Sequence, residues 1–223
     1  MPNLPNLDAL DADGAIRDSA EAAGLHRGDF LKKGVLAGGG LLAGGAFFNS
    51  YLANAEAAIS KHRSKKNDVK ILNYALTLEY LEAAFYKQAV ANKAFGSSAP
   101  LKAFAETVAE HEAKHVAFLK KALGSAAIKS PTFDFGDAVT DQAKFAATSQ
   151  VLEDTGVSAY LGQVGNLSQR AVLSAAGTIA TVEARHAAWI RDINGSNPAP
   201  ASFDVPASEK ATLKAVTGTG FIK

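Results

Sequence analysis

The sequence predicts an all-α fold, an antiparallel four-helix bundle with one long crossover between its second and third helices. Apolar residues recur at helical spacing almost throughout residues 56–195, which is the first observation behind this fold class. The second is a glutamate and a histidine three residues apart, a pair that occurs as Glu112 with His115 and again as Glu183 with His186. Residues at positions i and i+3 share one helix face, so each pair directs a carboxylate and an imidazole to a common point. Such a pair is half of a metal site, and the chain carries two.

The composition limits the chemistry that this fold can support. With 23 lysines and arginines against 22 aspartates and glutamates, the chain has no excess of basic groups, and no nucleic-acid partner is predicted. Hydrophobic residues make up 48% of the 223 positions, enough for one globular domain with its own core. Cysteine is absent, which excludes disulfides, thiolate metal sites, iron–sulfur clusters and cysteine nucleophiles. Any bound metal must therefore be held by glutamate, aspartate, histidine or water.

Residues 1–55 are predicted to form an N-terminal tail with an export signal or anchor. The apolar, glycine-rich run 34–48 is short for a membrane-spanning helix and has the length of the hydrophobic region of a signal peptide. The small residues at 53–55 supply a cleavage pattern. The segment 27–32 resembles the twin-arginine export motif, with Gly28 at the place of the second arginine.

We therefore expect an exported protein, located in the periplasm, in the cell envelope or outside the cell. The twin-arginine route is one way to reach these places, and the general secretory route is another. Two alternatives keep the segment in the mature protein: membrane association through residues 34–48, or a buried glycine- and alanine-rich core helix.

Two helices are predicted in the first half of the bundle. The first runs from a cap at Asn67 and Asp68 to about residue 92, and the second from Pro100 to about residue 123, where Gly124 ends it. Each has an inward stripe that mixes apolar and acidic residues: Leu72, Ala75, Glu79, Ala83, Tyr86 and Val90 on the first helix, and Phe104, Val108, Glu112, His115 and Leu119 on the second.

Residues 124–136 contain a proline, two glycines and no helical period, so they are predicted to be the extended crossover. A third helix is predicted from Asp137 to about residue 164, and a fourth over about 168–193. Residues 196–223 are predicted to form a loop-rich C-terminal tail with a short helix near 207–216. The fourth helix has an inward face made of Val172, Ala176, Ile179, Glu183, His186, Ile190 and Ile193.

An internal repeat relates the two halves of the bundle domain, residues 56–195. The segment TVAEHEAKH aligns with TIATVEARH at an offset of 71, and LEYLEAAFY aligns with LEDTGVSAY at an offset of 74. The four glutamate carboxylates that the repeat relates, those of Glu79, Glu112, Glu153 and Glu183, lie roughly 20 Å from the connecting turns. An antiparallel bundle therefore brings them near one level. The repeat pairs Glu79 with Glu153, Tyr86 with Tyr160, Glu112 with Glu183, and His115 with His186.

Charge explains why an apolar interior would contain these groups. An unpaired, ionised carboxylate is costly to bury, by tens of kcal/mol in the idealised limit. Four glutamates carry four negative charges and two neutral histidines carry none, so two divalent cations restore neutrality. One glutamate from each of two helices plus a Glu-x-x-His pair from each of two others is the ligand pattern of dinuclear iron and manganese carboxylate bundles. Oxygen and imidazole ligands without sulfur favour iron or manganese, with copper and zinc as competitors.

Residues 68–193 resemble the ferritin-like superfamily. Their segments LTLEYLEAAFY, LEDTGVSAY and VEARHAAWIR resemble those of exported bacterial ferritin-like proteins related to plant desiccation-related proteins. The resemblance implies a ferritin-like four-helix bundle that binds two divalent ions of iron or manganese. By position it implies Glu79 and Glu153 as single-helix ligands, Glu112 with His115 and Glu183 with His186 as paired ligands, and Glu112 and Glu183 as the bridging carboxylates.

The second Glu-x-x-His pair also resembles the Asp-Glu-x-Arg-His signature of di-iron oxygenases. The residue before Glu183 is Val182 where that signature has an aspartate, which weakens an oxygenase interpretation.

Other residues near the predicted site have two interpretations each. Tyr86 and Tyr160 are predicted to donate hydrogen bonds or single electrons in the reaction, or to be ordinary core tyrosines. Glu82, one turn after Glu79, either touches the metals or a metal-bound water, or hydrogen-bonds to the site or faces its rim. Gly156, its counterpart in the repeat, either leaves space for a small substrate or allows close helix packing. The two histidines without repeat partners, His62 and His111, are predicted to be surface groups.

The leading functional hypothesis is a dinuclear redox centre of the ferroxidase or peroxide-consuming kind, acting in stress protection outside the cytoplasm. Its partners would be metal ions and small oxidants, and a homo-oligomer is compatible with the sequence. Whether the centre turns over a substrate stays open. The alternatives are a protein that binds iron or manganese without catalysis, and a structural envelope protein in which the metals only stabilise the bundle.

Overall fold

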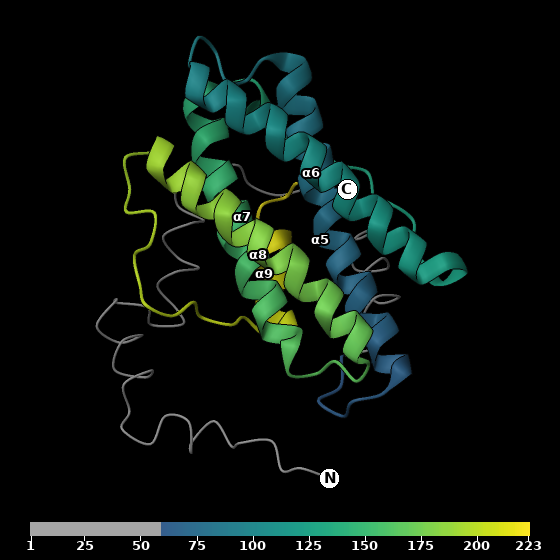
Figure 1. The fold of residues 1–223 in the computed structure, drawn as a ribbon. Coiled ribbons are helices and arrows are strands. Elements are labelled where there is room, and N and C mark those ends of the chain that lie inside the picture. The colour runs from purple at the N-terminus through teal and green to yellow at the C-terminus, as the bar shows by residue number, and fades with distance from the viewer. Residues whose placement is uncertain (1–58) are drawn as a thin grey trace.

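The structure, a computed structural model, describes residues 59–223 (Figure 1). The predictions for the tail and export segment fall on residues 1–55 and lie outside the described residues. Within the described range the chain is all-α, as predicted. It contains five α-helices, which are α5 (Lys65–Asn92), α6 (Ala99–Leu123), α7 (Gln142–Val164), α8 (Arg170–Ile193) and α9 (Glu209–Gly218).

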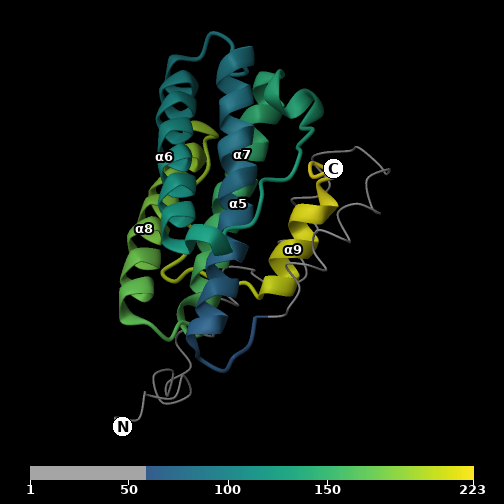
Figure 2. The same ribbon diagram turned by 90° about the vertical axis from the view of Figure 1, so that its right-hand side faces the viewer.

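Four of these helices form the bundle. Short connections join α5 to α6 and α7 to α8, so each of these pairs is antiparallel and its members lie side by side (Figures 1 and 2). The long crossover lies between α6 and α7, as predicted, and contains the 3₁₀ turns Gly124–Ala126 and Gly136–Val139. The two halves of the repeat are therefore two helical hairpins that face each other across the core.

The beginning of α5 differs from the prediction. Ser64 is its N-cap, because the side-chain oxygen of Ser64 accepts a hydrogen bond from the backbone N–H of Asn67. Asp68 does not cap its own helix. Its carboxylate accepts hydrogen bonds from the N–H of Ser168 at 2.8 Å, the hydroxyl of Ser168 at 2.7 Å and the N–H of Gln169 at 3.0 Å. Asp68 thus joins the start of α5 to the start of α8.

The third helix also begins later than predicted. Asp137 lies in a 3₁₀ turn, and α7 starts at Gln142 after Asp141, whose carboxylate accepts the N–H of Lys144 at 2.8 Å. The signals around the second helix are confirmed: Pro100 lies in the first turn of α6, and Gly124 ends the helix with a φ of 55°.

Apolar residues occupy the core on both sides of a polar level. On α6, Phe104 and Val108 are fully buried before this level and Leu119 is buried after it. On α8, Ile179 precedes the level and Ile190 follows it, and both are buried. The half of the core near the connection between α5 and α6 is aromatic, with a T-shaped contact between Tyr86 and Phe104 and stacked rings of Phe85 and Phe145. The polar groups between these two halves are shielded from water along the bundle axis.

The C-terminal segment packs against the bundle. Leu213 and Val216 of α9 are buried in the core, and α9 lies beside α7 (Figure 2). The α9 helix corresponds to the short helix predicted near 207–216. After it, the N–H of Asp134 in the crossover donates to the carbonyl of Phe221 at 2.8 Å, which ties the end of the chain to the crossover.

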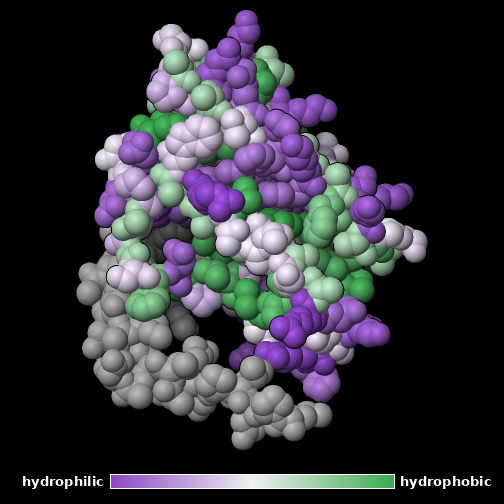
Figure 3. Space-filling view, viewed as in Figure 1, coloured by the Kyte–Doolittle hydropathy of each residue, from purple (hydrophilic) through white to green (hydrophobic). Residues whose placement is uncertain are grey.

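The bundle surface mixes hydrophilic and hydrophobic side chains. Figure 3 shows hydrophobic areas near the middle of the face seen in Figure 1, with hydrophilic areas around them. Large apolar side chains exposed on α6 and α8 include Phe118 and Leu173. Within residues 59–223, no helix has the length and apolar character needed to cross a membrane.

Candidate metal centre

Each of the four bundle helices contributes a fully buried glutamate to the polar level. Glu79 lies on α5, Glu112 on α6, Glu153 on α7 and Glu183 on α8, and each has 0% exposure. His186 on α8 is buried with them, whereas the side chain of His115 is 12% exposed. The helical period places all six on inward faces, which is where the sequence predicted them. The structure brings all six together, although they come from positions up to 107 apart in the chain (186 minus 79).

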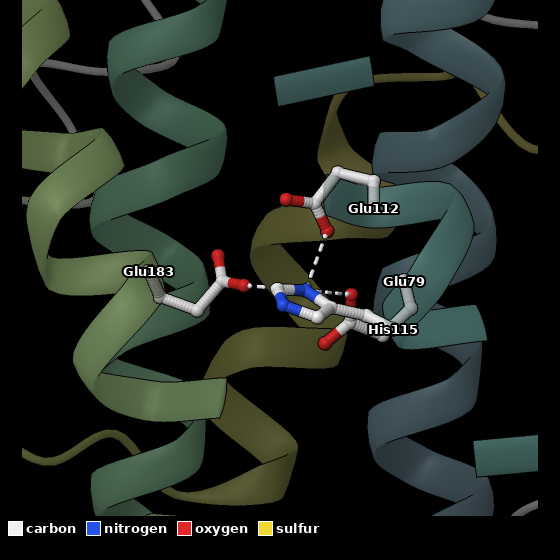
Figure 4. A group of neighbouring side chains, drawn as sticks. All are labelled: Glu79, Glu112, His115 and Glu183. Atoms are coloured by element: carbon white, nitrogen blue, oxygen red, sulfur yellow. Dashed lines mark hydrogen bonds and ion pairs between the residues drawn. The ribbon is translucent and has the colours of Figure 1, made fainter. Parts of the chain in front are cut away.

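Three carboxylates surround the Nδ1 atom of His115 (Figure 4). This nitrogen lies 3.2 Å from Glu79 Oε2, 3.2 Å from Glu112 Oε2 and 3.1 Å from Glu183 Oε1. One ring nitrogen carries at most one proton, so hydrogen bonding alone does not account for three such neighbours. Ligand atoms that share one ion at bonds of about 2.1 Å lie roughly 3.0–3.4 Å apart. The spacing around His115 matches that of ligands arranged about a common cation.

A second group of side chains surrounds His186. Its Nδ1 atom lies 3.2 Å from Glu153 Oε2 and 3.3 Å from Glu112 Oε1. Two sets of four residues could each hold a metal ion, with ligand atoms within 4.8 Å of one another in each set. The sets are Glu79, Glu112, His115 and Glu183, and Glu112, Glu153, Glu183 and His186. Glu112 and Glu183 belong to both sets, which is the arrangement expected of bridging carboxylates.

The buried oxygens of this cluster lack the partners that a metal-independent core would need. Within residues 59–223, no hydrogen bond reaches Glu79 Oε2, Glu112 Oε1 or either carboxylate oxygen of Glu183. Buried polar atoms without partners are uncommon and costly. Their short distances to histidine nitrogens, given above, lack hydrogen-bond geometry and so do not satisfy them. Divalent cations would, and the donor set of oxygens and imidazole nitrogens suits iron or manganese.

Ionisation in the cluster reflects burial and crowding. Burial, followed by the charges of neighbouring carboxylates, raises the pKa of Glu112 and Glu183 well above the usual value for glutamate. Burial opposes the charged form of His115, but the adjacent carboxylates of Glu112, Glu183 and Glu79 outweigh it and raise the pKa of His115 to about 12. Without cations, the cluster is therefore partly neutralised by protons.

The two tyrosines predicted near the site contact its carboxylates directly. The hydroxyl of Tyr86 on α5 donates to Glu153 Oε1 on α7, and the hydroxyl of Tyr160 on α7 donates to Glu79 Oε1 on α5. Both rings are buried, and burial together with the adjacent carboxylate raises the pKa of each phenol well above its usual value. The phenols therefore stay protonated and orient the two glutamates that lie outside the Glu-x-x-His pairs.

Glu82 and Gly156 lie beside the cluster. Glu82 is 3% exposed and does not face the rim of the bundle. A Cβ atom at Gly156 would lie 3.2 Å from Glu183 Oε2 and 3.4 Å from Glu82 Oε1. The carboxylates of Glu183 on α8 and Glu82 on α5 thus pack closely against Gly156 on α7, in the space that a side chain at this position would fill. Burial and then the charge of Glu183 raise the pKa of Glu82 well above its usual value.

The prediction for His111 is wrong, and the prediction for His62 is confirmed. His62 is exposed, whereas His111 is half-buried and its Nδ1 lies 2.8 Å from Nε2 of His186. The repeat gave no indication, because the counterpart of His111 is Val182. The position of His111 in the sequence could have indicated this contact. In the Asp-Glu-x-Arg-His signature of di-iron oxygenases a polar residue directly precedes the glutamate, and His111 directly precedes Glu112 in the same way.

Comparison with known proteins finds one family. The family model described as a ferritin-like domain matches residues 67–196, which is more than half of the chain. The matched range begins at the third residue of α5, extends past the end of α8 and contains every side chain of the polar level. No curated protein matches the sequence.

Proposed function

The chain belongs to the ferritin-like domain family, and on this basis we propose that it is a dinuclear metal carboxylate protein that binds two divalent ions of iron or manganese. One observation carries the proposal: two sets of buried ligand atoms share Glu112 and Glu183. In this assignment Glu79 and His115 complete one subsite, and Glu153 and His186 complete the other. Glu112 and Glu183, which belong to both sets, would be shared by the two subsites.

The charges of the cluster support two divalent ions. Four ionised glutamates balance the four positive charges of the two ions when both histidines are neutral. Glu82 would be a fifth negative charge in the same buried space. In the metal-free cluster, burial and then the charge of Glu183 raise the pKa of Glu82 well above its usual value, so Glu82 holds a proton there and adds no fifth charge.

We further propose that the centre reacts with O2 or peroxide. When bound, two iron ions would supply two electrons by passing from the ferrous to the ferric state. Two electrons and two protons convert one molecule of hydrogen peroxide to two molecules of water. The protein holds the ligands in place, keeps them out of bulk water and orients the outer carboxylates through Tyr86 and Tyr160. An apolar cavity of about 20 Å³ adjoins Tyr160 and is lined by Leu78, Leu119 and Ile179, among others.

Three parts of the proposal rest on the sequence. Export through the N-terminal segment, a place in the cell envelope or outside it, and a role in oxidative or desiccation stress follow from residues 1–55 and from the resemblance described above. Tyr86 and Tyr160 remain candidates for donors of hydrogen bonds or single electrons in the reaction. A homo-oligomer is supported by the exposed apolar side chains of α6 and α8.

A second candidate function is metal binding without turnover. It is favoured by the enclosure of the cluster, since five of its six ligands are at most 2% exposed and apolar core lies on both sides. Metals bound there would stabilise the folded state directly. This candidate predicts the same metal content as the first and no reaction with oxidants.

Two measurements on the full chain separate these functions. Elemental analysis of the purified protein is expected to find about two iron or manganese ions per chain, following the ligand pattern above. Stopped-flow absorption after the anaerobically iron-loaded protein is mixed with O2 or hydrogen peroxide is expected to show oxidation faster than that of free ferrous ion. Two bound ions without faster oxidation would favour the second candidate, and failure to bind two ions would refute both.

A further inference from the structure

His111 of α6 lies against His186 of α8. The Nδ1 atom of His111 and the Nε2 atom of His186 are 2.8 Å apart, and the two rings are inclined by only 19°. The other nitrogen of His186, Nδ1, faces Glu153 and Glu112. Each nitrogen of His186 therefore has its own surroundings: carboxylates on the inner side and one histidine on the outer side.

This arrangement selects a proton position when His186 binds a metal. The inner nitrogen, Nδ1, must present a lone pair to the ion, so a neutral imidazole carries its proton on Nε2. Nε2–H then donates to Nδ1 of His111, which must itself be unprotonated, and His111 keeps its proton on Nε2. We propose, on the basis of the proposed dinuclear centre, that His111 is a positioning residue that fixes the tautomer and ring orientation of His186 and so preorganises one of the two metal subsites.

The other subsite lacks such a partner in the part of the chain that the structure describes. Within residues 59–223, all polar contacts of the His115 ring are made by Nδ1, and its outer nitrogen, Nε2, makes no hydrogen bond. The repeat places Val182 at the position that corresponds to His111, and an isopropyl group neither donates nor accepts a hydrogen bond. His115 is also the more exposed of the two histidines.

The two subsites are thus unequal although the sequence repeats their ligands. Hydrogen-bond partners of metal-ligating histidines typically raise metal affinity by about 10- to 100-fold. The subsite that contains His186 is expected to bind its ion first, and the subsite that contains His115 is expected to bind the second ion more weakly.

Titration of the metal-free full chain with Co²⁺ alone, followed by calorimetry and by the visible absorption of cobalt, tests this order. The wild type is expected to bind two ions in two resolved steps. His111→Phe keeps the ring but removes the acceptor, and is expected to weaken the tighter step by about 10- to 100-fold so that the two steps merge. His111→Asn is expected to restore the tighter step, because its Oδ1 is attached at the same place as Nδ1 of histidine and also accepts a hydrogen bond.

Val182→Ala is the matched control, since it alters the corresponding position of the other half without removing a hydrogen bond. It is expected to leave both steps unchanged. A His111→Phe variant that melts as the wild type does and still shows two resolved steps of wild-type affinity would overturn the inference.

Nitrogen-15 NMR of the Zn²⁺-loaded wild type tests the inference without any substitution. The imidazole shifts are expected to show His186 protonated on Nε2, and His111 unprotonated on Nδ1 and protonated on Nε2. The opposite tautomer at His111 would overturn the inference. If the wild type bound no pair of ions, the proposed function would fail; if it bound a pair with equal affinity, only the role of His111 would fail.

Discussion

Tyr160 of α7 donates its phenolic hydrogen bond to Glu79 of α5, the glutamate of the opposite helical hairpin. Tyr86 of α5 makes the same contact in return with Glu153 of α7. In both helices the tyrosine follows the glutamate by seven residues, and α5 and α7 are antiparallel, so each tyrosine lies opposite the glutamate of the other helix. Each half of the repeat thus orients a carboxylate of the other half, and neither half has a complete site.

Tyr86→Phe and Tyr160→Phe are each expected to weaken metal binding by about tenfold or more, because a carboxylate ligand loses the hydrogen bond that orients it. Calorimetric titration with Mn²⁺ measures this change. Tyr80→Phe is the control on the same helix, since the hydroxyl of Tyr80 bonds to the carbonyl of Ile128 outside the cluster. Equal affinities in all four proteins would show that the phenols do not position the carboxylates.

Glu112→Gln is expected to lower the bound metal from about two ions per chain to less than one, because Glu112 faces both His115 and His186. The same variant is expected to melt at a higher temperature than wild type in the metal-free form near pH 8, since an amide replaces an acid whose ionisation is unfavourable there. Elemental analysis after dialysis and thermal unfolding measure the two effects. Glu106→Gln, an exposed change on α6, should alter neither.

Metal-free protein is expected to lose stability as the pH rises from about 5 to about 8. Burial and then neighbouring charges raise the pKa of Glu82, Glu112 and Glu183 in the folded state, so over this range the folded chain binds more protons than the unfolded chain. The stabilisation is complete below the unfolded pKa and is lost as the pH rises through the folded pKa. His115 acts in the same direction, because carboxylate partners raise its pKa to about 12.

Thermal unfolding in the presence of EDTA at a series of pH values measures this trend. Loading with Mn²⁺ should reverse the trend, because deprotonated carboxylates bind metal more tightly. A melting temperature that rose with pH in the metal-free protein would contradict the assignment of raised pKa values.

Gly156→Ala and Gly177→Ala form a matched pair of helical glycine substitutions. At Gly177 a Cβ atom would meet nothing within 4 Å, so alanine is expected to stabilise α8 by about 0.5–1 kcal/mol. At Gly156 the same atom would lie 3.2 Å from Glu183 Oε2, so the gain should be lost and metal affinity should fall. Chemical denaturation and metal titration of both variants give the comparison. Equal behaviour of the two variants would mean that Gly156 has no role at the cluster.

Asp68→Ala is expected to destabilise the fold by about 1–3 kcal/mol, because the N–H groups of Ser168 and Gln169 lose their acceptor at the start of α8. Urea unfolding of the metal-free protein measures the change. Asp192→Ala, an exposed change near the end of α8, should cost less than about 0.5 kcal/mol. A small effect at Asp68 would show that the contact between the helix ends contributes little.

Much of the fold follows from local patterns in the sequence. Positions of the four bundle helices, the crossover and the short C-terminal helix could be predicted because the helical period and residues such as Pro100 and Gly124 act within one or two turns. The cap of α5 could not be assigned from local signals. Asp68 is a favourable cap residue, yet its partners lie 100 and 101 residues away, and Ser64 caps the helix instead.

The sequence by itself determined that a Glu, Glu-x-x-His set, repeated twice, faces the interior of this bundle, because helical spacing fixes the direction of a side chain locally. Only the tertiary structure decided which of these groups touch. The contacts Tyr86 to Glu153, His111 to His186 and Tyr160 to Glu79 join residues 67, 75 and 81 positions apart. These pairings depend on the register in which two hairpins pack, and that register is set by the whole core. The repeat predicted the same ligand set in both halves, and the structure shows that the surroundings of the two sets differ. His111 lies behind His186, whereas the outer nitrogen of His115 makes no hydrogen bond among residues 59–223.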